Sequence, residues 1–116
     1  MNPILVTTTS NDRNELEAIA RQLIEQRLAA CCQILGPMSS IYRWNEEVET
    51  ATEWMCTIKT CAELYEQVEA LVRNLHSYEV PEIIAMPINN GNAGYLQWLT
   101  ESTGEKGRNS NSTHQE

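Results

Sequence analysis

Residues 40–59 read SIYRWNEEVETATEWMCTIK and contain two runs, 40–44 and 53–59, in which polar and large apolar side chains alternate. Alternation with a period of two is typical of a β-strand that buries one face. The pattern therefore predicts a long antiparallel hairpin with its tip near Asn45 and Glu46. Neither tip residue is glycine, so we expect a loose or strained turn, because Glu adopts a left-handed backbone less readily than Asn.

The chain before the hairpin predicts a strand, a helix and the start of another strand. Residues 4–9 are uncharged and rich in β-branched side chains, which favours an interior strand. Asp12 and Glu15 form a capping-box pattern ahead of apolar residues spaced by three and four, so residues 12–27 predict an amphipathic helix. Residues 28–35 then predict a strand that bends or bulges at the Gly-Pro pair that follows.

The chain after the hairpin predicts a second helix, a last strand and a short final helix. Thr60 and Glu63 form another capping-box pattern, and the apolar spacing behind them predicts a helix over about 62–75. Residues 83–86 are apolar and stand between two prolines, which favours a brief strand with fixed ends. A cluster of Asn and Gly then precedes a short helix at 95–99.

This order of elements is that of the α+β ferredoxin-like βαββαβ fold, in which both long helices cover one face of an antiparallel sheet. The predicted hairpin is longer than two helices can shield. Its apolar side chains should therefore meet another surface, and we expect self-association, because an exposed apolar patch usually marks an oligomer contact. The alternative is that the hairpin folds back over its own sheet. The side chains concerned are Ile41, Tyr42, Trp44, Val48 and Trp54.

Length and charge limit the classes of function. A chain of 116 residues fits one domain, which we place at 1–102, and the polar residues 103–116 predict a disordered tail. The net charge of −8 argues against nucleic acid and anionic membranes as partners and favours cations. The sequence shows neither a signal-peptide pattern nor an apolar run long enough to span a membrane, so we expect a cytoplasmic protein.

The four cysteines do not form a recognisable motif. Cys31, Cys32, Cys56 and Cys61 match neither a CxxC redox pattern nor a paired zinc knuckle, so reduced thiols are expected. Neighbouring residues of a strand point to opposite faces, which makes joint binding of one ion by Cys31 and Cys32 unfavourable.

Residues 76–87, HSYEVPEIIAMP, carry the ionisable side chains that are most suited to a site. His76 stands at the predicted end of the second helix, where a helix dipole favours its imidazolium form. A histidine on a loop held beside a sheet suits a metal ligand or a pH switch. The alternative is a histidine that only satisfies an internal hydrogen bond.

Taken together and in order, several segments resemble the CutA divalent-ion tolerance proteins along nearly the whole predicted domain. They are LAAC at 28–31, SIYRW at 40–44, IKT at 58–60, HSYEVPE at 76–82 and YLQWL at 95–99. The resemblance implies a ferredoxin-like subunit in a tight homotrimer, whose long hairpins pair between subunits and whose shape is that of the PII signalling proteins. It also implies a role linked to copper and other divalent ions.

The resemblance carries over only part of the copper site proposed for the best-known bacterial members. Their ligands are a cysteine on the first strand and two consecutive histidines. Thr8 stands at the cysteine position here, and Leu75 and His76 stand at the histidine pair. Ser77 replaces a usual proline, and Glu46 replaces a frequent glycine at the hairpin tip.

Three functional hypotheses follow. The first is a non-enzymatic protein that binds or responds to copper or another divalent cation, with His76, Cys31 and Glu82 as candidate ligands and no cofactor required. The second is a PII-like signalling trimer that binds a small molecule or a partner protein in clefts between subunits. Its candidate cleft residues, each of which could equally be interface packing, are Tyr42, Trp44, Lys59, Tyr78 and Glu82.

The third hypothesis is a thiol enzyme with Cys31 or Cys32 as nucleophile and His76 as base. A nucleophile needs a base within hydrogen-bond reach and a third group to orient that base. The sequence offers no motif for such an arrangement, so we predict that the protein is not an enzyme.

Overall fold

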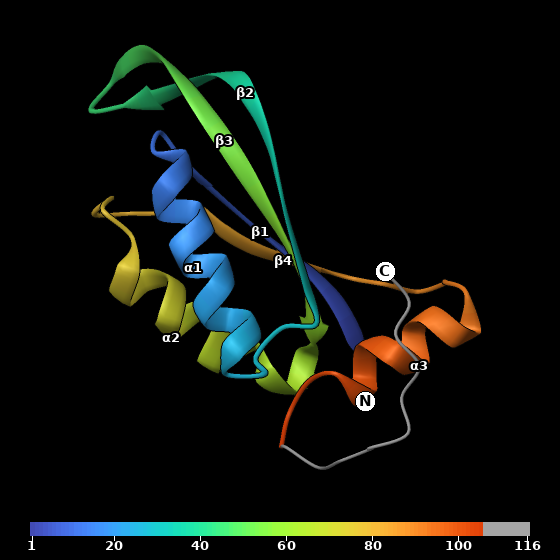
Figure 1. Ribbon diagram of the computed structural model, residues 1–116. Helices are drawn as coiled ribbons and strands as arrows, with labels where there is room; N and C mark the ends of the chain where they lie inside the picture. Colours follow the sequence, from blue (N-terminus) through green and yellow to red (C-terminus); the bar gives the residue numbers. More distant parts are fainter. Residues whose placement is uncertain (106–116) are drawn as a thin grey trace.

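The computed structural model describes residues 1–105, which form a four-stranded sheet with two helices on one face (Figure 1). A short third helix lies near one end of the sheet. The elements in order are β1 (Pro3–Ser10), α1 (Arg13–Glu25), β2 (Cys31–Trp44), β3 (Glu47–Cys61), the 3-10 turn η1 (Ala62–Leu64), α2 (Tyr65–Leu75), β4 (Ile83–Pro87) and α3 (Ala93–Glu101).

The sheet has the strand order β2-β3-β1-β4, and every neighbouring pair is antiparallel. β1 lies in the middle of the molecule, where Val6 pairs with Ile58 of β3 on one side and with Ala85 of β4 on the other. The ferredoxin-like α+β prediction, with its long hairpin between β2 and β3 and its short last helix, is therefore confirmed.

The core lies between the sheet and the helices α1 and α2. Apolar residues that alternate along β1 and β3 face apolar residues at helical spacing, and burial of each large side chain contributes roughly 1.5–3 kcal/mol. Three polar side chains on the helix-facing side, those of Thr8, Ser10 and Thr60, are also fully buried. The fully buried large apolar residues of this layer are Val6, Leu16, Ile19, Leu23, Ile58, Val68 and Val72.

The first helix begins as predicted, but the second does not. Asp12 is the N-cap of α1, and its carboxylate accepts from the backbone N–H of Asn14 at 3.0 Å. The second capping box is wrong, because Thr60 lies within β3 and donates its hydroxyl to the carbonyl of Leu28 at 2.6 Å. The 3-10 turn η1 follows β3, and α2 begins only at Tyr65.

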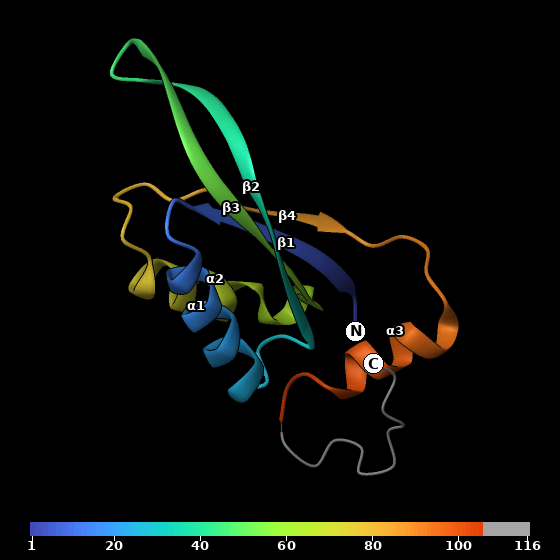
Figure 2. The ribbon, with the colours of Figure 1, turned by 45° about the horizontal axis from the view of Figure 1, so that its top comes forward.

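The hairpin projects beyond the body of the molecule, so it does not fold back over its own sheet (Figures 1 and 2). The predicted bulge falls between Leu35 and Met38, where the register with β3 shifts. Gly36 sits in this bulge with φ of +144°. At the tip, Asn45 and Glu46 have φ of +50° and +66°, which confirms the expected backbone strain there.

The face of the sheet turned away from α1 and α2 carries apolar side chains among polar ones such as Thr7, Thr57 and Lys59. Register and alternation place Leu5, Leu35, Met55, Ile84 and Met86 on this face, which we call the open face. Ile84 and Leu35 are each 52% exposed. Together with the exposed apolar side chains of the hairpin, these residues form an apolar surface that the described part of the chain leaves uncovered.

The C-terminal end of the described chain is packed rather than loose. Thr103 is fully buried, and its hydroxyl donates to the carbonyl of Thr100 at 3.1 Å. Arg27, at φ of +58°, donates from its guanidinium to the carbonyls of Glu101 and Gly104, and its own carbonyl accepts from the N–H of Gly104. Thr103 and Gly104 therefore pack against the end of α1 and α3.

The remainder of the predicted tail, 106–116, lies outside the described residues. Among residues 1–105, every helix is too short or too polar to cross a bilayer.

Candidate functional site

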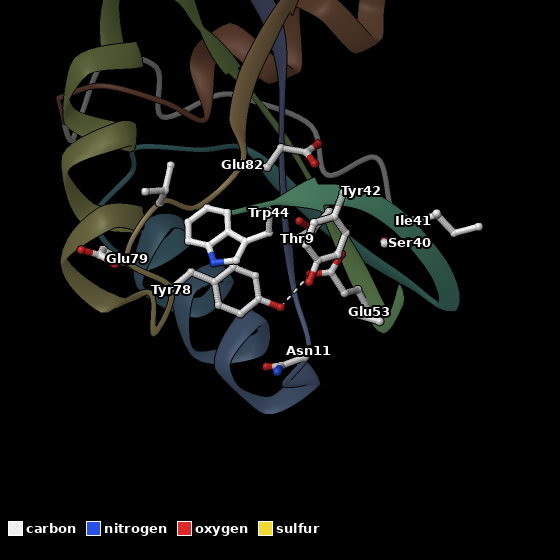
Figure 3. A pocket seen from close by; sticks show the side chains of 12 residues that line it. Thr9, Asn11, Ser40, Ile41, Tyr42, Trp44, Glu53, Tyr78, Glu79 and Glu82 are labelled. Atoms are coloured by element: carbon white, nitrogen blue, oxygen red, sulfur yellow. Dashed lines mark hydrogen bonds between the residues drawn. The ribbon is translucent and has the colours of Figure 1, made fainter. Parts of the chain in front are cut away.

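A groove of about 610 Å³ lies between the projecting part of the hairpin, within residues 40–53, and the loop that joins α2 to β4 (Figure 3). The hairpin contributes aromatic and acidic side chains, and the loop contributes a tyrosine and two more carboxylates. The end of β1 closes the groove between them. Its lining residues are Thr9, Asn11, Ser40, Ile41, Tyr42, Trp44, Ala51, Glu53, Tyr78, Glu79, Val80 and Glu82.

One hydrogen bond joins the two walls of the groove. The Tyr78 hydroxyl donates to Oε2 of Glu53 at 2.6 Å, across the gap between loop and hairpin (Figure 3). Burial raises the pKa of Tyr78, and the hydrogen bond to Glu53 and the negative charge of that carboxylate raise it further. Tyr78 therefore stays neutral at physiological pH and acts as a donor to a carboxylate that is only 7% exposed.

His76 lies behind the groove as an internal bridge. It caps the C-terminus of α2, and its side chain is fully buried. Nε2 lies 2.7 Å from the carbonyl oxygen of Thr9, while Nδ1 accepts from the backbone N–H of Tyr78 at 3.0 Å. These partners assign the proton to Nε2 and give Nδ1 the lone pair. Both ring nitrogens are therefore engaged inside the protein. His76 thus fits the alternative of a histidine that satisfies internal hydrogen bonds.

A carboxylate steadies the same junction. Glu15 Oε2 lies 3.4 Å from Nδ1 of His76 and accepts from the Ser10 hydroxyl, and Oε1 accepts from the backbone N–H of Ser77. Ser10 in turn accepts from the backbone N–H of Asp12. Glu15 therefore ties the start of α1 to the end of α2, instead of closing a capping box on Asp12.

The three candidate metal ligands do not meet within one subunit. His76 lies beside Thr9, whereas Cys31 pairs with Lys59, which lies across from Leu5 at the other end of β1. Four residues of strand separate these positions, or about 13 Å. Glu82 is exposed at the groove. Nowhere in the described chain do three His, Cys, Asp or Glu side chains converge as a metal site would require.

Thr8 and Leu75, which stand at positions of the copper ligands proposed for related proteins, are fully and partly buried, respectively. Thr8 faces the helices, and its hydroxyl has no hydrogen-bond partner among residues 1–105. Leu75 is partly buried and packs against the core. Neither side chain offers a group that is both metal-binding and accessible.

The thiols show no catalytic arrangement. The hydrogen bond between Cys32 and Cys56 raises the pKa of Cys32, as does burial, so this thiol stays protonated at neutral pH. The ring nitrogens of His76, the proposed base, bond to Thr9 and Tyr78 instead. The described residues therefore do not bring the His76 ring within hydrogen-bond reach of a thiol, as the thiol-enzyme hypothesis requires.

The structure brings four of the predicted cleft residues together and separates one. Tyr42, Trp44, Tyr78 and Glu82 all line the groove. Lys59 lies elsewhere, with Nζ 3.4 Å from the Tyr95 hydroxyl and 5.5 Å from the centre of that ring. Glu53 was missed, because a glutamate in an alternating strand looks like a solvated residue until the loop that covers it is placed.

Comparisons with known proteins agree on one family. The family model described as "CutA1 divalent ion tolerance protein" matches residues 4–102. The divalent-cation tolerance protein CutA of Thermus thermophilus is 43% identical over 101 residues, which are 87% of this chain and 96% of that protein. Human protein CutA is 42% identical over 85 residues, 73% of this chain, and the match spans only 48% of the human protein.

Solved structures agree with the sequence matches. A divalent cation tolerance protein from Thermus thermophilus superposes with a TM-score of 0.86 at 41% identity, covering 88% of this chain and 99% of that one. CutA1 from Oryza sativa superposes with a TM-score of 0.87 at 37% identity, covering 90% and 96%. Sequence, fold and the order of the segments thus converge, and the chain belongs to the CutA1 divalent ion tolerance protein family.

Proposed function

We propose that this protein is a non-enzymatic divalent-cation tolerance protein that binds or responds to copper and other divalent cations as a homotrimer. The observation that carries the proposal is the family match over residues 4–102. The acidic surface supports it, because a net charge of −8 raises the local concentration of cations. The four cysteines are thiols, which suits the cytoplasm that we expect as its location.

Self-association is supported by the uncovered apolar surface. Ile84 and Met86 on the open face are 52% and 47% exposed, and Val48 of the hairpin, which lies outside the groove, is 67% exposed. Surface of this kind suits contact with further copies of the chain. Light scattering on a sizing column should give three times the 13.2 kDa mass of the chain. A monomer at micromolar concentration would contradict the proposal.

Metal binding, on this proposal, uses side chains from more than one subunit. Within the described part of one subunit, candidate ligands do not converge, whereas a trimer repeats each of them three times. Cys31 offers a soft sulfur ligand and Glu82 an exposed carboxylate. His76 is the least suited of the three, because Tyr78 and Thr9 occupy its nitrogens.

Anaerobic titration with Cu²⁺ tests this assignment. We expect His76→Ala to leave stoichiometry and affinity unchanged, provided circular dichroism shows that the variant is folded. Glu82→Gln and Cys31→Ser should each weaken binding severalfold. A loss of binding in folded His76→Ala alone would place His76 in the ligand set and contradict the assignment.

A second function is favoured by the groove. A volume of about 610 Å³ is in the range of small-molecule sites, and three aromatic side chains meet buried and exposed carboxylates there. We propose that this groove takes a small molecule. The PII-like hypothesis placed such a site in clefts between subunits, whereas the residues of this groove all come from one subunit. Thermal-shift screening of the purified protein against nucleotides, amino acids and amines tests this, and a flat response to all three classes would contradict it.

A further inference from the structure

We propose that the groove selects an organic cation, a small alkylammonium ion whose charged head pairs with Glu53 and whose methyl or methylene groups lie against Trp44, Tyr42 and Tyr78. The inference rests on the second function proposed above and names the chemical class of its ligand.

The charge of the groove favours a cation. Three carboxylates, those of Glu53, Glu79 and Glu82, line it, and none of its lining residues is Lys, Arg or His. An anionic ligand would meet only like charge. A neutral ligand would leave the carboxylates as they are in the empty groove, whereas an ammonium ion would gain a Coulomb attraction that low-dielectric walls strengthen.

Glu53 is the strongest reason to expect a positive ligand. Glu53 is only 7% exposed, yet the group that donates a hydrogen bond to its carboxylate is the neutral phenol of Tyr78. Among residues 1–105, the ion pairs involve Glu15 and Glu17, and none involves Glu53. A buried carboxylate without a counter-ion is costly, so a cation beside it would be bound favourably.

The aromatic walls distinguish an organic cation from a metal ion. Indole and phenol faces attract cations within about 6 Å of the ring, and they suit ammonium groups that carry alkyl substituents. A hard divalent ion instead needs about six oxygen ligands, and the described residues contain no cluster of three candidate ligands. The side chains of Trp44, Tyr78 and Glu53 all point into one space in Figure 3.

A matched pair of probes tests the charge requirement. Choline and 3,3-dimethyl-1-butanol have nearly the same shape, but only choline carries a positive nitrogen. Isothermal titration calorimetry on the full-length assembled protein should show choline binding at least tenfold more tightly than the alcohol. Acetate, the anionic probe, should not bind.

A matched pair of variants tests the place of binding. Glu53→Gln removes the charge but keeps an oxygen that can accept from Tyr78, and it should weaken choline binding at least tenfold. Glu25→Gln makes the same change of net charge at an exposed residue of α1 outside the groove, and it should leave choline binding unchanged. Trp44→Leu, at a side chain 46% exposed, should also weaken binding and provides a second variant if Glu53→Gln does not fold.

The outcomes separate this inference from the proposal beneath it. Equal affinity for choline and the alcohol, or equal choline affinity in Glu53→Gln and Glu25→Gln, would overturn the cation assignment while leaving the groove as a small-molecule site. A different result would overturn the organic-cation class but retain the groove as a site. In that case choline would not bind at millimolar concentration, whereas a nucleotide or another anion would give a thermal shift that Trp44→Leu abolishes. No response to any probe would overturn both.

Discussion

At the scale of single residues, two side chains, His76 and Tyr78, hold the loop after α2 through different hydrogen bonds. His76 is fully buried and bridges Thr9 to the backbone of Tyr78. Tyr78 then reaches across the groove to Glu53. The position of one groove wall therefore depends on a histidine that does not line the groove.

Replacing Tyr78 with Phe should make the protein less stable at pH 7 by about 1 kcal/mol, because Glu53 loses its hydrogen-bond donor. The raised pKa of Tyr78 means that the folded state holds the phenolic proton more tightly than the unfolded chain. This contribution is complete below about pH 10, the ordinary tyrosine pKa, and is lost as pH rises above it.

Urea unfolding followed by circular dichroism from pH 7 to pH 11 measures the effect. The difference between wild type and Tyr78→Phe should shrink above pH 10. Tyr42→Phe removes a hydroxyl from the other tyrosine of the groove and should show no such pH dependence. A constant difference across the range would mean that Tyr78 does not contribute through its proton.

Sequence reasoning identified some of these residues but not their contacts. Tyr42, Trp44, Tyr78 and Glu82 stood out as aromatic or charged residues near an expected cleft, and they do line one groove. The engagement of both nitrogens of His76 could not be foreseen, because Thr9 lies 67 residues away along the chain. Such a partner becomes visible only when β1 and the end of α2 are placed side by side.

At the scale of elements, the hairpin depends on a single bulge in β2. Gly36 has φ of +144°, and a Cβ built on it would lie 2.7 Å from Cδ1 of Trp54. Glycine is therefore required twice, by the backbone conformation and by the close approach of an indole ring. The bulge lets β2 run as one strand from Cys31 to Trp44.

Gly36→Ala should destabilise the protein by about 1–3 kcal/mol, because it combines backbone strain with a side-chain clash. Ser39→Ala, at an exposed position of the same strand, should change the free energy of unfolding by less than about 0.5 kcal/mol. Chemical unfolding of both variants gives the comparison. Similar stability of Gly36→Ala and wild type would show that the bulge can relax around a methyl group.

The prediction of helices and strands succeeded where a periodic pattern of apolar residues extended over many positions. It failed where a residue of a local capping motif bonds to a distant part of the chain instead. The alternation in the hairpin and the helical spacing behind Asp12 were reliable. Thr60 matched a capping motif, yet its hydroxyl bonds to the carbonyl of Leu28, 32 residues away. The tip at Asn45 and Glu46 was predicted because side-chain type alone sets the cost of a left-handed turn.

At the scale of the whole molecule, the two faces of the sheet differ in kind. One carries the helices α1 and α2, and the other exposes Leu35 of β2 and Ile84 and Met86 of β4. Assembly into a homotrimer would cover this surface. The chain would then owe part of its stability to protein concentration, as obligate oligomers do.

Ile84→Glu should break this assembly, because it places a charge on the open face, on the edge strand β4, at a residue 52% exposed in the subunit. Ile24→Glu makes the same change at a residue of α1 that is 40% exposed on the helix side, and it should leave the assembly intact. Light scattering at micromolar concentration distinguishes them. Equal masses for the two variants would mean that the open face is not the contact.

The hydrogen bonds of Arg27 to the C-terminal end of the described chain bear on the order of folding. Its guanidinium joins carbonyl groups 74 and 77 positions further along the chain, at Glu101 and Gly104. We expect contacts between such distant positions to form late, because closing a large loop costs conformational entropy before the contacts can stabilise the chain. We therefore expect the last helix to dock after the first helix has ended at Arg27, because both partners of these hydrogen bonds must be in place before the bonds can form.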